Sequence, residues 1–287
     1  MKKIIQHIIL CCICCACTTV LPDTGEDIDR SGHTLFNVDI ENLSLAGTSI
    51  PGRWEDGDRI GVYGSEAGQN VPYYLKRGGE GLQAAAFYGS VVRGDIISYA
   101  PYDKGITSAI VPCELQRIQE FQPEAGKADW FLKYNPRTFA AMGEDGILHF
   151  HYPMGLLSVA FKFDEPVSVK EITLKSTKGI SGLLDIDKSG YVQPSAITGK
   201  EISLDLGGKL VPSKSGSSFT EFLFVLPPAV YAAGELSLSV VTPEENMLLM
   251  LPELEVKRVE NADFPVLSIV VTSKNLPGFE KEDGYLE

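Results

Sequence analysis

Residues 33–41 read HTLFNVDIE, and from Phe36 onward apolar and polar side chains alternate strictly. Phe36, Val38 and Ile40 fall on one side of an extended chain, because successive side chains of a strand point to opposite faces. The polar residues between them fall on the other side. This two-residue period predicts a half-buried strand at residues 33–42.

The same short alternating or apolar pattern recurs along the rest of the chain, and Gly, Pro, Asn and Asp separate the segments. The segments are residues 59–63, 95–100, 147–151, 158–163, 171–175, 201–206, 222–226, 235–241 and 266–271. Their spacing is typical of β-sandwiches. No window of ten or more residues carries a convincing helical stripe. The sequence therefore predicts an all-β chain.

A length of 287 residues favours two domains, because one small core needs fewer residues than this. The best connector on composition is NPRTFAAMGEDG at residues 135–146. We therefore expect an N-terminal β-sandwich at residues 33–145 and a C-terminal β-sandwich at residues 146–287.

The first residues have the features of an export signal. Lys2 and Lys3 precede an apolar run at residues 4–16, which is shorter than the roughly 20 residues that a membrane-spanning helix needs. A basic start, a short apolar core and a small final residue indicate a signal peptide at residues 1–16. Residues 17–32, rich in Pro, Asp, Gly, Thr and Ser, are expected to form a flexible tether.

Five of the six cysteines lie at residues 11–17. Their C-x-x-C spacing also occurs in metal and redox sites, but such a site needs a folded polar surround that an export signal does not supply. Bacterial lipidation uses a cysteine after a small residue, and Ala16-Cys17 is the one such pair here. We expect Cys17 to carry the lipid anchor. Cys113, the remaining cysteine, is expected to be a buried structural thiol.

Charge and motif content exclude several classes of function. A net charge of −13 without a local Lys/Arg cluster disfavours nucleic-acid binding. The sequence has no G-x-S-x-G, phosphate-binding glycine loop or H-E-x-x-H, so we predict no enzyme, no cofactor and no catalytic residue. His149 and His151 point the same way on a strand and suit a metal, but no third ligand lies nearby in the sequence. We favour a structural role for His151 and predict no metal site.

Trp54 and Trp130 leave two functions open. An exposed tryptophan stacks on sugars, whereas a buried one anchors a sandwich core. Exposure of either ring would favour a glycan-binding protein.

The block WEDGDRIGVY at residues 54–63 resembles the W-x-x-G-D-x-I-G-V-[FY] block of the fimbrillin-like (Mfa-like) lipoproteins of Bacteroidales, the subunits of type V pili. Further matches follow in family order and cover nearly all of the chain after the tether. They are YAP at residues 99–101, GKAD at 126–129, FH at 150–151, LLSVAF at 156–161, ITL at 172–174, GISG at 179–182 and FVLPP at 224–228.

This resemblance implies two tandem transthyretin-like β-sandwiches in a pilus subunit or pilus-associated adhesin. It implies export as a lipoprotein to the outer membrane and the cell surface, where an arginine-specific protease cuts behind the first strand. A strand from another subunit then fills the groove. Arg53 is the candidate cleavage site, and cutting there would release residues 17–53 with Phe36, Val38 and Ile40. Cutting at Arg30 would leave the strand in place.

The resemblance also names the partners: other pilus subunits or a second copy, a host protein or glycan, and the membrane through the lipid anchor, with no nucleic acid. Two alternatives stay open. The first is that Arg53 is an ordinary loop residue and not a cleavage site. The second is that the chain is a monomeric outer-membrane lipoprotein that binds glycans. The polar tail at residues 272–287 is either disordered or carries sparse apolar anchors.

Overall fold

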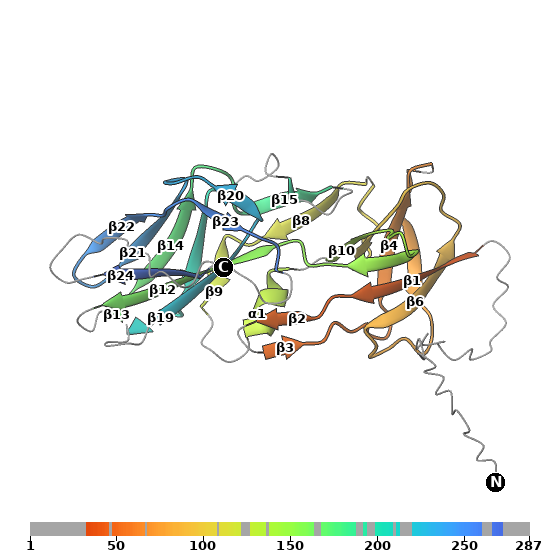
Figure 1. Cartoon of the computed structure of the whole chain (residues 1–287), viewed down its shortest axis with the longest axis horizontal. Coiled ribbons are helices and arrows are strands. Elements are labelled where there is room, and N and C mark those ends of the chain that lie inside the picture. Colours follow the sequence, from red (N-terminus) through yellow and green to blue (C-terminus); the bar gives the residue numbers. More distant parts are fainter. Residues whose placement is uncertain are drawn as a thin grey trace, which may run out of the picture.

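The alternating segment at residues 33–41 forms strand β1 (His33–Ile40) in the computed structural model of the chain. The structure describes residues 33–45, 48–66, 68–107, 109–121, 127–135, 138–163, 168–187, 192–193, 199–208, 211–212, 220–259 and 266–271. Within these ranges, the helical content is the single short helix α1 (Lys127–Lys133), and the other regular elements are strands (Figure 1). The prediction of an all-β chain is confirmed. Among the described residues, no helix has the length and apolar character needed to span a membrane.

Seven strands of the N-terminal part form one sheet, on the right in Figure 1. Its order is β10-β7-β4-β5-β6-β1-β11. Besides β1, the strands are β4 (Arg59–Gly64), β5 (Val71–Leu75), β6 (Ala84–Ser90), β7 (Ile96–Ala100), β10 (Thr138–Ala141) and β11 (Ile147–Phe150).

The two end strands of this sheet, β10 and β11, are themselves joined. Antiparallel bridges connect Phe139 with His151 and Met142 with Leu148. Phe139 and His151 exchange both backbone hydrogen bonds, at 3.0 and 2.9 Å. The sheet therefore returns on itself as a ring of seven strands. A closed ring protects the main-chain groups that the edges of an open sheet present to other chains.

The block at residues 54–63 forms the turn into β4 and the strand itself. Gly57 has φ of +85°, a conformation that a side chain disfavours, and the Asp58 carboxylate accepts the Glu55 N–H at 2.7 Å. Gly61 lies directly against the Tyr99 ring, so a Cβ at this position would collide with it. The turn conformation and the close contact with Tyr99 thus explain why glycine and aspartate occupy these positions of the block.

The remaining strands build several smaller sheets, on the left in Figure 1. One sheet has the order β22-β21-β14-β17-β9 and another the order β19-β12-β24. The strands of this part are β8 (Val111–Leu115), β9 (Ile118–Glu120), β12 (Gly155–Phe163), β13 (Ser168–Val169), β14 (Glu171–Ser176), β15 (Gly182–Ile186), β16 (Val192–Gln193), β17 (Glu201–Asp205), β18 (Val211–Pro212), β19 (Thr220–Leu226), β20 (Ala229–Tyr231), β21 (Leu236–Val241), β22 (Asn246–Met250), β23 (Leu254–Val256) and β24 (Val266–Val271).

Several strand pairings cross the expected domain boundary. Strands β8 and β9, which precede residue 145, pair with β15 and β17 of the C-terminal part. Strand β11, which follows residue 145, pairs with β1 in the N-terminal ring. The division at residue 145 stays a prediction from sequence composition.

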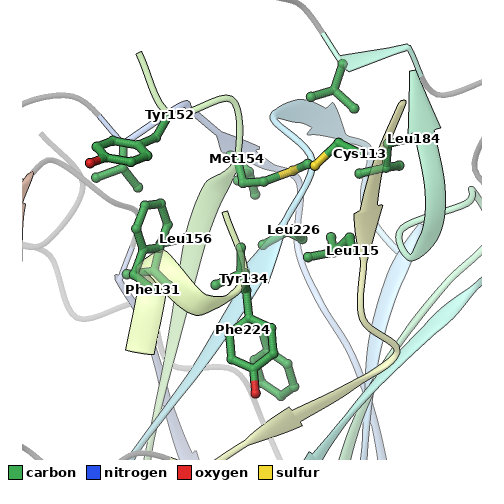
Figure 2. Close-up of a cluster of buried hydrophobic side chains, with 14 of the residues drawn as sticks. Cys113, Leu115, Phe131, Tyr134, Tyr152, Met154, Leu156, Leu184, Phe224 and Leu226 are labelled. Atoms are coloured by element: carbon green, nitrogen blue, oxygen red, sulfur yellow. The ribbon is translucent and has the colours of Figure 1, made fainter. Parts of the chain in front are cut away.

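A buried cluster at the middle of the molecule joins the two parts (Figure 2). Cys113 and Leu115 of β8 enter it beside Phe131 of α1 and Leu226 of β19. The Cys113 side chain is only 2% exposed and lies among apolar neighbours in Figure 2. A buried thiol of this kind packs as a small apolar group.

Candidate functional site

Strand β1 is one of the seven strands of the ring, and it has a hydrogen-bonded neighbouring strand on each side. It runs antiparallel to β6, where Phe36 lies opposite Phe87, and parallel to β11, where Asp39 lies opposite His149. Removal of β1 would therefore expose the main-chain donors and acceptors of two strands at once.

The three alternating apolar residues of β1 all point into the core. Phe36, Val38 and Ile40 are 9%, 1% and 8% exposed, and the Phe36 ring lies 5.1 Å from the Tyr73 ring. Burial of one such side chain contributes about 1.5–3 kcal/mol. Packing of these three side chains in the core therefore makes the main apolar contribution to keeping β1 in the sheet.

On the opposite face of β1, Asp39 contacts His149 of β11, a histidine that lies between two carboxylates. Asp39 Oδ1 lies 2.8 Å from His149 Nδ1, and Asp145 Oδ2 lies 3.0 Å from His149 Nε2. Because ionised carboxylates only accept hydrogen bonds, both ring nitrogens make these bonds fully only when the ring is protonated. Partial burial acts to lower the pKa of His149, but the hydrogen bonds that the ring donates to Asp39 and Asp145, together with the negative charges of these carboxylates, outweigh it, so the pKa is raised above 6.5.

A second pair continues along the same edge. Glu41 Oε2 lies 3.1 Å from His151 Nδ1, while Glu41 Oε1 accepts the backbone N–H of Tyr152 at 2.6 Å. The two histidines thus point the same way, as their spacing predicts, and face the carboxylates of Asp39 in β1 and of Glu41 directly after it. The described residues contain no group of three or more His, Cys, Asp and Glu suited to a metal ion.

Sequence analysis missed this pairing of β1 with β11. The sequence does contain a pattern that indicates this pairing, because Asp39 and Glu41 have the same two-residue spacing as His149 and His151. The pairs are separated by 110 positions, so only the strand order brings them together.

Arg53 lies on the surface at the end of the first segment, between two buried residues. Gly52 donates its N–H to Asn42 Oδ1 at 3.1 Å. Trp54 is 2% exposed and packs on Phe87 and Phe150 with ring distances of 4.9 and 5.2 Å.

The backbone around Trp54 is also held in place. Its N–H donates to Leu82 O at 3.0 Å, its carbonyl accepts the Gly81 N–H at 2.7 Å, and its indole N–H donates to Gln83 O at 3.1 Å. A protease needs an extended segment, so cleavage after Arg53 requires local opening of this loop.

The segment that such cleavage would release contains two more strands. Strands β2 (Leu43–Leu45) and β3 (Thr48–Ile50) form an antiparallel hairpin next to α1, away from the ring (Figure 1). The segment therefore contacts the ring through β1 and the middle of the molecule through the hairpin.

Several predicted features lie outside the described residues. These are the signal peptide, the lipidation candidate Cys17, the tether, Arg30 and the tail at residues 272–287.

The two tryptophans are both buried. Trp130 is 3% exposed, and its indole N–H donates to Glu120 O at 2.6 Å. Neither ring is available to stack on a sugar, so the condition that would have favoured a glycan-binding protein is not met.

No protein-family model and no curated protein matches this sequence. The structure is similar to that of a "putative cell adhesion protein" from Bacteroides ovatus, with 14% identity, a TM-score of 0.50, and coverage of 88% of this chain and 96% of that chain. The chain shares the fold of this protein. It also resembles the tip fimbrial protein Mfa3 from Porphyromonas gingivalis, with 10% identity, a TM-score of 0.44, and coverage of 86% and 99%. The structural neighbours are thus fimbrial and "putative cell adhesion" proteins of Bacteroidales, the group that the motifs predict.

Proposed function

We propose that this chain is a non-enzymatic subunit of a surface fibre, or an adhesin associated with one, that assembles by β-strand insertion between subunits. It reaches the outer membrane as a lipoprotein anchored through Cys17. The observation that carries the proposal is the place of β1, an early strand with three core-facing anchors that lies between two partners in a closed ring.

The physical argument rests on closure of the ring. While β1 is present, its two neighbours are fully paired along it, and no open edge there can take up another strand. When β1 leaves, the edges of β6 and β11 and the seats of Phe36, Val38 and Ile40 are open together. A strand from another subunit gains main-chain hydrogen bonds and apolar anchors by entering that slot.

Cleavage after Arg53 supplies the means of removal. The Arg53 side chain is exposed, whereas Gly52 and Trp54 on either side are buried. We therefore expect cleavage to be limited by opening of the loop that holds Trp54. Once the chain is cut, β1 is no longer covalently tied to the ring that it completes.

The test is treatment of the purified precursor with an arginine-specific protease. We expect a new N-terminus at Trp54 and, with time, a ladder of SDS-resistant oligomers on gels. Arg53→Lys keeps the charge but removes the cleavage site, and it should abolish both results. A precursor that stays intact at Arg53, or that is cut there and stays monomeric, would overturn this assembly route.

A further inference from the structure

On the outer face of the ring, His149 of β11 and His151, which follows β11 directly, face Asp39 of β1 and Glu41, which follows β1 directly. Asp39 and His149 are directly paired residues of the two parallel strands, and Glu41 and His151 follow two positions later. His149 is 38% exposed and Asp39 is 35% exposed, so these pairs are partly shielded from water. The inference drawn from them rests on the proposed function, because it concerns the strand that replaces β1.

Apolar anchors alone do not define the register of an inserted strand. A slip by one residue would turn Phe36, Val38 and Ile40 outward and is strongly disfavoured. A slip by two residues keeps apolar side chains inward, since side chains alternate with a period of two. An additional contact is needed to exclude such even-numbered slips.

The histidines supply this contact. If β1 moved forward by two residues, Asn37 would face His149 and Asp39 would face His151. Glu41 would then leave both His151 and the backbone N–H of Tyr152, to which its two oxygens now bind at 3.1 and 2.6 Å. In the opposite slip, Glu41 would face His149 and Leu43 would face His151. Each slip thus loses at least one charge-assisted hydrogen bond.

We propose that His149 and His151 set the register of the inserted strand and select its chemistry. The strand that fits carries carboxylates at two alternate outward positions and apolar side chains at the inward positions around them. The partner is therefore a strand of another subunit with an acidic–apolar alternation like that of residues 38–41, VDIE.

Peptide insertion into the full chain cleaved after Arg53 tests this selection at pH 6. The probe is a fluorescent peptide of residues 33–42, HTLFNVDIEN, added in excess and followed by anisotropy. A neutral peptide carries Asp39→Asn and Glu41→Gln. A matched control keeps the charge but moves it, through Leu35→Asp, Asn37→Glu, Asp39→Asn and Glu41→Gln.

We expect both altered peptides to bind about three- to tenfold less tightly than the natural one, the effect of two partly exposed charged pairs. Cleaved protein with His149→Gln and His151→Gln should bind the natural and neutral peptides equally. The comparison on the wild-type protein does not depend on how the double variant folds.

The outcomes separate the two proposals. Equal binding of all three peptides to the wild-type protein would overturn the role of the histidines and leave strand insertion standing. Failure of every peptide to enter the cleaved protein would overturn strand insertion and the selection with it. Equal weakening of both altered peptides excludes a general charge effect and supports pairing at these positions.

Discussion

The side-chain amide of Gln119 on β9 makes both hydrogen bonds to the backbone of Val225 on β19 that a neighbouring strand would otherwise make. Its amide nitrogen donates to Val225 O at 2.8 Å, and its amide oxygen accepts the Val225 N–H at 2.9 Å. Gln119 is fully buried, and β19 is an end strand of its sheet. One polar side chain thus satisfies two buried backbone groups and ties two sheets together.

Gln119→Ala should lower the free energy of unfolding by about 2–4 kcal/mol, because two buried backbone groups lose their partners. Urea denaturation followed by circular dichroism measures this loss. Gln116→Ala, at an exposed position on the same segment, should change stability by less than about 0.5 kcal/mol. Equal effects of the two substitutions would contradict the structural role of the Gln119 amide.

Phe36→Ala should loosen β1, since it removes the aromatic anchor that packs on Tyr73. We expect a loss of about 3–5 kcal/mol, the usual result of truncating a buried phenylalanine. Hydrogen exchange should also become faster in the neighbouring strands β6 and β11. Leu35→Ala is the control, because Leu35 is the preceding residue of β1 and is 54% exposed. Unchanged exchange in β6 and β11 would show that this anchor does not hold the strand.

The contact between Asp39 and His149 should make the stability of the ring depend on pH. The pKa of His149 is raised in the folded chain, so its contribution is complete below the unfolded value near 6.5 and is lost as the pH rises through the folded value. The backbone N–H of Ile147 and then the His149 ring lower the pKa of Asp145 below 3.8, so its contribution is lost only in strong acid. These two groups therefore favour the folded ring most between about pH 4 and 6.5.

Thermal unfolding at pH 6 and pH 8.5 checks this dependence. We expect the wild-type melting temperature to fall at the higher pH and His149→Gln to lose most of that difference. His33→Gln, on the same face of β1, serves as a histidine control, and its ring contacts Tyr88. A pH difference that persists in His149→Gln would show that another group causes it.

Gly61→Ala should destabilise β4, because the added methyl group would collide with the buried Tyr99 ring. The expected cost is about 1–3 kcal/mol, as for other overpacked cores. Chemical denaturation measures it, with Gly105→Ala in an exposed loop as the matched control. If Gly61→Ala had the stability of the wild type, the Tyr99 side chain would move aside at little cost in free energy.

Much of the first strand could be predicted from its own residues. Phe36, Val38 and Ile40 point inward because alternation along a strand is a local property, and a local property can be recognised in nine consecutive residues. The same holds for the turn at Gly57 and for the all-β character of the chain.

The tertiary structure decided which strands lie next to one another. Asp39 meets His149 across 110 positions, and Gln119 meets Val225 across 106. The alternation of apolar and polar residues predicts which face of a strand is buried, but it does not predict which other strand pairs with it. Those partners follow from the closure of the whole ring and from the packing of sheets against each other, which depend on the entire chain at once.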